Sequence, residues 1–390
     1  MQFKFTEEQE RFRAEVRQWL DQNLPKDWEE RGEEGDEEGQ RRERTMARRL
    51  GERGWLAIGW PKEYGGAARP LMDQVIFKEE IAYRRAPGFN VQGPEMIGNT
   101  MLVFGTEEQK KTFLPPMARG EVMWCQGYSE PEAGSDLAGL KTRAVADGDD
   151  LVLNGQKIWT SGAHVADWIF VGVRTDTQAP KHKGISLVIM PVKTPGISVR
   201  PIINMAGHKG LNETFFDNAR VPKANVIGEI NRGWYVMAGL LDFERSGISG
   251  FSGAQRSVEE LADWARATTV AGRRLSSHAL VRNKLAQMAI DVAVGRNLSY
   301  RIAWMQSSGK LPNTEASIAK LFSSELSQRI ARQGGEIMGL FGIVAPGSRW
   351  APLKGRYEQS YMTSVPSTIA GGTSEIQRNI IATRGLGLPR

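Results

Sequence analysis

Glu244 is the acidic residue best placed to do chemistry, because it interrupts an otherwise apolar helical pattern. The residues that share its helical stripe are all apolar: Met237, Leu240, Leu241, Ile248 and Phe251. A carboxyl group on such a stripe is expected to face a core or a cleft, where desolvation raises its pKa toward the range of a general base. The alternative is a structural glutamate that is neutralised by one of the chain's many arginines.

Residues 127–136 form a polar segment that could contact a planar ligand. The segment reads Gly-Tyr-Ser-Glu-Pro-Glu-Ala-Gly-Ser-Asp, with two glycines, a proline and two serines. This composition predicts a fixed loop with exposed N–H groups and hydroxyl donors, which suits a polar heterocycle or a phosphate. For this segment taken alone, an ordinary turn is the commoner explanation.

A second segment, residues 154–162, carries an aromatic side chain between polar ones. Asn154 and Gly155 predict a turn that feeds a strand, and the strand would present Trp159 with the hydroxyls of Thr160 and Ser161. An indole can stack on an aromatic cofactor. On this segment alone, the pattern favours a core tryptophan of a β domain.

A third segment, residues 371–378, predicts the start of a helix. Gly371 and Gly372 precede Thr373, Ser374 and Glu375. Free N–H groups at a helix start can hold a pyrophosphate, but a plain N-cap by Thr373 or Ser374 explains the same pattern.

Several classes of site are excluded or disfavoured. The chain has one cysteine, Cys125, and four widely separated histidines, so a disulfide framework and a metal centre are not expected. Dinucleotide-binding, P-loop and nucleophile-elbow motifs are absent from the sequence. The net charge of +6 is a mild excess that favours phosphate-bearing ligands more than nucleic acid. Because neither a targeting segment nor a long apolar run is found, we expect a soluble cytoplasmic protein without membrane spans.

The elements that must position these residues follow the order helix, strand, helix. The length of 390 residues predicts two or three domains, and the pattern favours three: 1–120 helical, 121–231 β and 232–390 helical. Capping boxes begin helices at Thr6 and Thr106, and a charged run over 29–44 predicts a solvated loop. Apolar runs at 169–173 and 185–190 predict strands of a mainly antiparallel domain. Spaced apolar residues from 318 to 330 predict a long amphipathic helix.

Taken together, five segments in register resemble the acyl-CoA dehydrogenase family. They are 104–110 with Leu114 and Pro115, 129–136, 154–157 with Trp159, 220–222 with Ile227 and Gly228, and 372–378. The resemblance implies an α+β fold with an N-terminal α-helical domain, a central β-barrel and a C-terminal four-helix bundle. It implies an FAD enzyme that oxidises the Cα–Cβ bond of an acyl-CoA, with an electron-transfer flavoprotein as the usual electron acceptor.

The resemblance also assigns residues to this site. The positions that match the family's cofactor contacts are Gln126, Tyr128, Ser129, Gly134, Ser135, Trp159, Thr160, Ser161, Thr373, Ser374 and Glu375. The positions that match its substrate contacts are Ser135, Asp242, Arg245, Gly371 and Gly372. Many members carry the catalytic base at the position of Gly371, which has no carboxylate. A minority carry it within a Leu-Asp-x-Glu-Arg context, as at Glu244, so the resemblance and the apolar stripe select the same base.

A second departure concerns the contacts that one subunit makes with its neighbour's FAD. The family's arginine for those contacts aligns with Thr268, and the Phe-Gly that follows it aligns with Ala271 and Gly272. Arg273 and Arg274 are nearby substitutes, and a glutamine that usually precedes a Gly-Gly pair aligns with Glu336. Two assemblies are therefore compatible with the sequence. The chain could form a homodimer or homotetramer, or it could be the catalytic chain of a heterotetramer that acts on steroid side-chain or dicarboxylic acyl-CoAs. An oxidase, a desulfinase-like enzyme or a non-catalytic member of the fold remain alternatives. The absence of a side chain at 371 favours bulky acyl groups.

Overall fold

The computed structural model describes residues 4–25, 28, 37–243 and 247–389, and at positions 37 and 240–243 it describes the backbone alone. The chain divides into two compact units. The first unit contains Met1–Lys26, Pro70–Ala86 and Arg245–Arg390, and the second contains Asp27–Arg69 and Pro87–Glu244. Helices and strands are both abundant, so the expected α+β class and the order of helix, strand and helix along the chain are confirmed.

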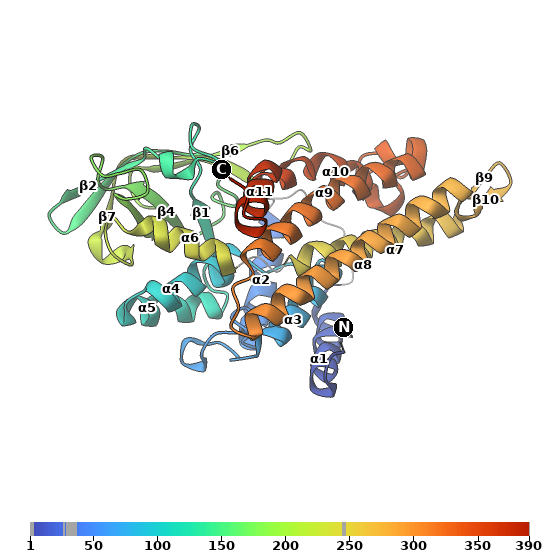
Figure 1. Ribbon diagram of the computed structural model, residues 1–390, viewed down its shortest axis with the longest axis horizontal. Helices are drawn as coiled ribbons and strands as arrows, with labels where there is room; N and C mark the ends of the chain where they lie inside the picture. The colour runs from blue at the N-terminus through green and yellow to red at the C-terminus, as the bar shows by residue number, and fades with distance from the viewer. Residues whose placement is uncertain (1–3, 26–27, 29–36, 244–246, 390) are drawn as a thin grey trace. The chain divides into compact units, whose positions relative to one another are not determined.

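The first unit is built from helices. Its elements are α1 (Glu7–Asn23), α3 (Leu71–Tyr83), α7 (Ile248–Ala267), α8 (Ala279–Ser307), α9 (Asn313–Met338), α10 (Arg356–Thr363) and α11 (Ser374–Ile380), with a short hairpin of β9 (Thr269–Val270) and β10 (Arg273–Arg274). In Figure 1, α7 and α8 run side by side and the β9–β10 hairpin joins their far ends. Their core includes Phe251, Leu261, Met288 and Leu326, all buried. The long amphipathic helix expected over 318–330 is α9.

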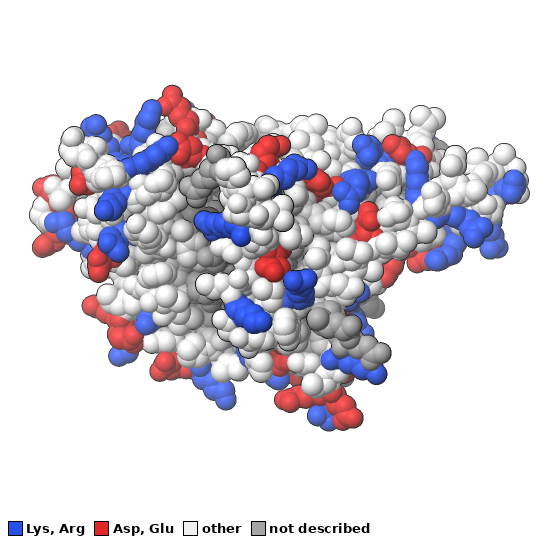
Figure 2. All heavy atoms as spheres, in the orientation of Figure 1, with Lys and Arg blue, Asp and Glu red and all other residues white. Residues whose placement is uncertain are grey.

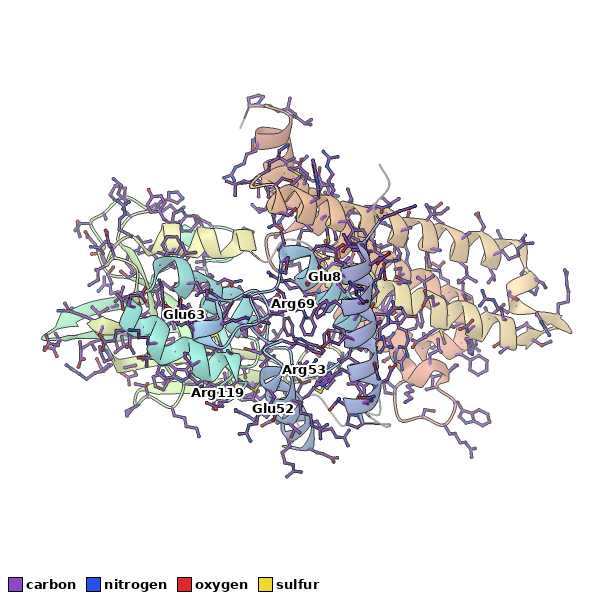
Figure 3. The ribbon with its side chains drawn as sticks, turned by 90° about the horizontal axis from the view of Figure 1, so that it is seen from below. Glu8, Glu52, Arg53, Glu63, Arg69 and Arg119 are labelled. Carbon is purple, nitrogen blue, oxygen red and sulfur yellow. The ribbon has the colours of Figure 1, made fainter. Side chains whose placement is uncertain are left out.

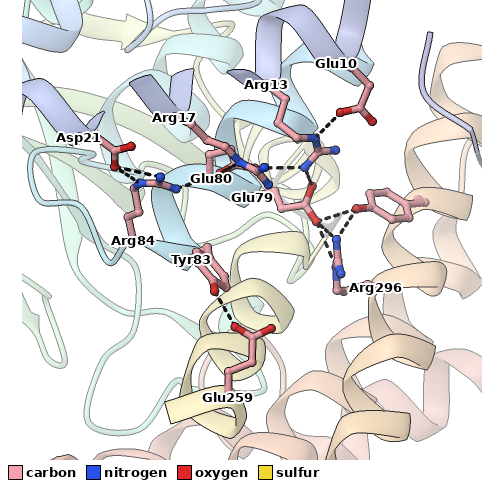
Figure 4. Close-up of polar contacts among 11 residues, drawn as sticks. Glu10, Arg13, Arg17, Asp21, Glu79, Glu80, Tyr83, Arg84, Glu259 and Arg296 are labelled. Carbon is pink, nitrogen blue, oxygen red and sulfur yellow. Dashed lines mark hydrogen bonds and ion pairs between the residues drawn. The ribbon is translucent and has the colours of Figure 1, made fainter. Parts of the chain in front are cut away.

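A buried ionic network ties α1 to α3 and α8 within the first unit (Figure 4). Glu79 of α3 accepts hydrogen bonds from Arg13 at 2.5 Å and from the Tyr300 hydroxyl at 2.6 Å, and it also pairs with Arg296. Burial opposes ionisation of this carboxyl, but the surrounding donors hold its pKa below the usual range. The network therefore fixes the N-terminal helix through charge-assisted hydrogen bonds.

The described residues of the second unit include an eight-stranded sheet. Its strands are β1 (Trp124–Gly127), β2 (Arg143–Asp147), β3 (Asp150–Lys157), β4 (Trp168–Arg174), β5 (Ile185–Pro191), β6 (Ile197–Ile202), β7 (Leu211–Pro222) and β8 (Val226–Ile227). The strand order is β6-β7-β3-β2-β4-β5-β8, and β1 pairs with β4. Most neighbours are antiparallel as expected, whereas β1 and β2 each pair with β4 in parallel. The strands expected at 169–173 and 185–190 are β4 and β5.

Helices of the second unit are α2 (Glu37–Glu52), α4 (Asn99–Phe104), α5 (Glu107–Ala118) and α6 (Gly233–Phe243). The ends of α2 and α5 lie side by side, since a Cβ on Gly51 would come within 2.6 Å of the Arg119 backbone. Figure 3 labels Glu52 and Arg119 at these ends. Apolar residues from these helices and from the sheet, such as Met101, Leu114, Phe170 and Met237, share one buried core.

Local signals in the sequence predicted the helix starts. Thr6 and Thr106 both form complete capping boxes, in which each threonine accepts from the backbone N–H three residues on and the glutamine side chain reaches back. The Asp147-Gly148-Asp149-Asp150 turn also forms as expected, with Asp147 paired to Asp150 across the β2–β3 hairpin.

Two local expectations were wrong. Residues 37–44, within the charged run expected as a loop, form the first half of α2, and 29–36 lie outside the described residues. Asn154 and Gly155 lie inside β3 rather than in a turn. The pairing of β3 with β7 shifts register between Leu153 and Gly155, so the glycine marks a bulge. The division into 1–120, 121–231 and 232–390 stays a proposal.

Candidate functional site

The loop after β1 has a buried base and an exposed rim. Tyr128 is buried, and its ring meets the Phe170 ring edge-on at 5.6 Å between centroids. Burial raises the pKa of the Tyr128 hydroxyl. Gly134 and Ser135 are exposed, and a Cβ at Gly134 would meet no heavy atom within 4 Å in the described part of the chain. The rim of the loop therefore has room for a ligand.

The segment after β3 holds Trp159 in an unusual conformation. Its φ is +61°, in the left-handed region, and 56% of the residue is exposed. The indole is therefore neither on a strand nor in a core, which corrects both expectations for this residue. Left-handed backbone in a bulky residue is strained and concentrates at functional sites.

Hydrogen bonds on both sides of Trp159 hold this conformation. The Ile158 N–H donates to the Ser129 carbonyl at 2.9 Å, and the Thr160 N–H donates to the Asn212 carbonyl at 2.9 Å. The Asn212 side-chain amide returns a hydrogen bond to the Thr160 carbonyl at 2.8 Å. Because the Ile158 bond joins the two segments, the structure brings the loop of Gln126–Ser135 and the segment Trp159–Ser161 together in the second unit.

The third segment forms a capped helix start in the first unit. Thr373 is the N-cap of α11 and accepts from the Ile376 N–H at 3.2 Å, so the plain N-cap exists. Gly371 and Gly372 have φ of +64° and +87°, and the Lys320 ammonium donates to the Gly372 carbonyl at 2.7 Å. A Cβ at Gly371 would have Lys320 Cε, at 3.9 Å, as its nearest neighbour among the described residues, so the space beside it is open.

The expected base and two expected substrate contacts are not described by the structure. Glu244 and Arg245 lie outside the described residues, and at Asp242 the backbone alone is described, at the end of α6. The apolar stripe around Glu244 does not continue through one helix, because α6 ends at Phe243 and α7 begins at Ile248. Gly247 between them has a φ of +68°, which breaks the helical path.

Thr268, Ala271 and Gly272 align with the family's contacts to a neighbouring subunit's FAD. They lie where α7 ends and the β9–β10 hairpin leads to α8. Thr268 ends α7, and Ala271 and Gly272 form the left-handed turn of the β9–β10 hairpin. Arg273 and Arg274 are exposed on that hairpin, and Figure 2 shows Lys and Arg side chains gathered at this end of the molecule. Glu336 of α9 pairs with Lys284 of α8.

The residues present fit a flavin cofactor. Thr160 is fully buried, and its Oγ1 has no hydrogen-bond partner among the residues described. In the same described set, the buried Ser374 Oγ is also without a partner. Buried hydroxyls without partners are costly unless a ligand or water satisfies them. Together with the exposed indole of Trp159, the Thr160 hydroxyl suits a planar heterocycle that carries polar edges.

Sequence reasoning missed Lys157, Glu130 and Asn212. Lys157 and Glu130 form a buried ion pair beside the two second-unit segments, and Asn212 holds Thr160 from β7. One signal was available for Lys157: it is a charged residue on a strand whose other inward positions include Leu151 and Leu153. Its partner lies 27 residues earlier, so no local pattern identifies it.

Among the described residues, no group of three or more His, Cys, Asp or Glu side chains could hold a metal ion. Of the helices described, none is long and apolar enough to cross a membrane. Cys125 is buried, and burial raises the pKa of its thiol, so the thiolate nucleophile is disfavoured.

Comparisons with known proteins cover the whole chain. Family models described as "Acyl-CoA dehydrogenase, N-terminal domain", "middle domain" and "C-terminal domain" match residues 6–121, 125–219 and 231–386. Acyl-CoA dehydrogenase FadE26 of Mycobacterium tuberculosis is 38% identical, covering 100% of this chain and 99% of the relative.

Two solved structures are similar over their full length. The steroid acyl-CoA dehydrogenase Tcur3481-Tcur3483 is 35% identical with a TM-score of 0.89, and 100% of each chain is covered. The ChsE4-ChsE5 complex from Mycobacterium tuberculosis is 37% identical with a TM-score of 0.88, again with 100% of each chain covered.

Proposed function

The chain belongs to the acyl-CoA dehydrogenase family, and on this premise we propose that it converts an acyl-CoA thioester to the trans-2-enoyl-CoA, with Glu244 as the base. Members of this family are FAD-dependent oxidoreductases, and this chain is one of them. The bound FAD supplies the acceptor for the hydride that leaves Cβ.

The roles of the chain's own residues follow from chemistry. The α-hydrogen of a thioester is acidic enough for a single carboxylate to remove it, so we assign that proton to the Glu244 carboxylate. The thioester then loses a proton from Cα and a hydride from Cβ, and the double bond forms between these carbons. Ser135, Asp242, Arg245, Gly371 and Gly372 are proposed to bind the CoA substrate.

The observation that carries the cofactor side of this proposal is the exposed, left-handed Trp159 beside the buried Thr160 hydroxyl. We assign Gln126, Tyr128, Ser129, Gly134, Ser135, Trp159, Thr160 and Ser161 to the flavin, and Thr373, Ser374 and Glu375 to the remainder of FAD. Hydrogen bonds from the N–H of Glu375 itself and from the Thr373 side chain lower the pKa of the Glu375 carboxyl.

We further infer a bulky, cyclic or branched acyl group. Gly371 supplies no side chain, and the space beside its Cα is open among the described residues. The similarity to the steroid acyl-CoA dehydrogenase Tcur3481-Tcur3483 supports this class.

Anaerobic mixing of the FAD-loaded protein with a panel of acyl-CoAs tests the reaction and its substrate class. We expect bleaching of the flavin absorbance, fastest with steroid side-chain or branched acyl-CoAs, and transfer of the electrons to an electron-transfer flavoprotein. A flavin that no acyl-CoA bleaches would overturn the dehydrogenase proposal. In a parallel assay in air, fast reoxidation of the reduced flavin by O₂ would favour an oxidase instead.

A second candidate is the catalytic chain of a hetero-oligomer. Thr268, Ala271 and Gly272 stand where the family carries its contacts to a neighbour's FAD, and one similar structure is a complex of ChsE4 and ChsE5. This candidate predicts that the chain purified alone lacks full activity or FAD, and that a second acyl-CoA dehydrogenase-like chain restores both. A stable homotetramer with one FAD per chain and full activity would exclude it.

A further inference from the structure

A buried ion pair underlies the two segments that meet in the second unit. Lys157 is fully buried and Glu130 is 8% exposed. The Lys157 ammonium donates to the Glu130 carboxylate at 2.7 Å and to the Tyr128 carbonyl at 3.1 Å. Both contacts reach from the end of β3 to the loop that follows β1.

The Glu130 carboxylate holds more than its ion-pair partner. It accepts from the Lys141 N–H at 2.6 Å and from the Thr142 N–H at 2.9 Å, just before β2. One carboxylate therefore fixes three stretches of backbone: the loop itself, the residues that lead into β2 and the end of β3.

Arg174 holds the far end of the same loop. Its guanidinium donates to the Ala138 carbonyl at 2.6 Å and to the Leu140 carbonyl at 3.4 Å. Gly134 and Ser135 therefore lie between two fixed ends of the loop, one at Glu130 and the other at 138–140. Their position relative to Trp159 depends on those two ends.

A gain in folding stability does not readily explain why the chain has a buried ion pair at this place. Desolvation of two charges offsets most of their attraction, and apolar residues of similar volume often replace buried ion pairs without loss of stability. Burial lowers the pKa of Lys157 to about 8, although Glu130 opposes this shift. We therefore look for the role of the Lys157–Glu130 pair in the backbone segments whose positions it fixes.

We propose that Lys157 and Glu130 are positioning residues for the flavin, because their ion pair sets the distance between the loop 128–136 and the segment 158–161. Tyr128 and Ser129 precede Glu130 directly, and Trp159 follows Lys157 by two residues. The inference rests on FAD binding at this site, and it does not require Glu244 to be the base.

The test compares FAD binding in variants of this pair with a matched control. Glu130→Gln and Lys157→Met each break the pair, and Glu79→Gln breaks a buried carboxylate network in the first unit. Apoprotein of each variant is titrated with FAD, and the dissociation constant, the resolution of the visible flavin band and the melting temperature are recorded. We expect the dissociation constant to rise about ten-fold and the band to lose its shoulders in Glu130→Gln and Lys157→Met. Glu79→Gln should lower the melting temperature without either change.

The double variant Glu130→Gln/Lys157→Met distinguishes an effect on the position of the flavin loop from an effect on folding stability. With both charges removed, the melting temperature should recover while the dissociation constant stays raised. Recovery of FAD binding together with the melting temperature would overturn the inference. Should a single variant fail to fold, Glu130→Asp retains the charge but shortens its reach, and we expect a rise of about three-fold.

The FAD titration of the wild-type protein distinguishes failure of this inference from failure of the proposed function. Wild-type protein that binds FAD, with unchanged binding and spectra in all variants, would overturn this inference alone. An equal loss of FAD binding in Glu79→Gln would also overturn it. Wild-type protein that binds no FAD, either alone or with a second acyl-CoA dehydrogenase-like chain, would remove the proposed function and this inference with it.

Discussion

At the scale of single residues, Trp159 combines strain with exposure. A left-handed conformation costs a bulky residue about 1–2 kcal/mol, and a tryptophan residue that is 56% exposed recovers little of that cost by burial. Contact of the indole with FAD, as proposed above, would account for this strain. This separates Trp159 from the buried tryptophans, such as Trp124, which is 2% exposed.

Replacement of Trp159 by asparagine should move stability and cofactor binding in opposite directions. Asparagine adopts the left-handed region more readily than tryptophan, so Trp159→Asn should stabilise the apoprotein by up to about 1 kcal/mol. Loss of stacking should weaken FAD binding by about three- to ten-fold. Urea unfolding of apoprotein and FAD titration measure the two effects.

Trp124→Phe provides the contrast, because Trp124 stacks on Trp168 at 5.4 Å in the core. It should destabilise the apoprotein. A similar loss of stability in Trp159→Asn would mean that the exposed indole has a packing role, against this interpretation.

At the scale of elements, the bulge in β3 sets the position of Lys157. Gly155 has a φ of +152°, and a Cβ there would lie 2.7 Å from the Thr142 Cα. The glycine permits a close approach of the residues that lead into β2, where the Glu130 carboxylate is also bonded. The bulge therefore belongs to the same arrangement as the ion pair.

Gly155→Ala should destabilise the second unit by about 1–3 kcal/mol, because backbone has to move to admit the methyl group. Gly148→Ala is the matched control: its φ is +59°, but its Cβ would meet no described atom within 4 Å. Urea unfolding should show a larger loss for Gly155→Ala. Equal losses would mean that φ strain alone, and not the close approach, constrains Gly155.

Elements defined by local interactions could be predicted from the sequence, and those defined by distant contacts could not. Thr6 and Thr106 cap their helices through residues three positions away, so the pattern was sufficient. Asn154-Gly155 has the composition of a turn, but the approach of Thr142 from another part of the sheet makes it a bulge. The apolar stripe around Glu244 suggested one helix, whereas Met237 packs in the core of one unit and Phe251 in that of the other.

The candidate site shows the same difference between local patterns and distant contacts. Exposed loop residues were found because their composition is unusual, and the family resemblance assigned them to FAD. The ion pair of Lys157 and Glu130 depends on burial and on a partner 27 residues away. The strand pattern indicates that Lys157 is buried, but one sequence does not identify its partner.

At the scale of the whole molecule, a group of arginines around Glu260 joins elements of the first unit. Arg85 donates to the Glu260 carboxylate at 3.0 Å, Arg356 at 2.5 Å and Arg256 at 2.6 Å. Burial opposes ionisation of Glu260, but the arginines outweigh it and lower its pKa to about 2 from 4.5.

This shift predicts a stability that falls in acid. A carboxyl whose folded-state pKa is lowered stabilises the fold above its ordinary pKa, and that contribution is lost as the pH falls from 4.5 toward about 2. We expect a contribution of about 3 kcal/mol near neutral pH. Glu260→Gln should lower the free energy of unfolding most at pH 7 and progressively less below pH 4.5.

Urea unfolding across this pH range measures the effect. Glu132→Gln is the control, because Glu132 pairs with Lys141 on the surface and is 76% exposed; it should change stability little at any pH. A difference between wild type and Glu260→Gln that does not vary with pH would contradict the assigned linkage.

Glu244 is proposed to remove the α-proton of an acyl-CoA, and rapid anaerobic mixing of FAD-loaded protein with a reactive acyl-CoA measures that step. Glu244→Gln should bind FAD like the wild type but bleach the flavin about 10²–10⁴-fold more slowly, because the amide cannot accept the proton. Glu229→Gln, which alters an exposed carboxylate, should bleach at the wild-type rate. A Glu244→Gln variant that bleaches as fast as the wild type would contradict the account.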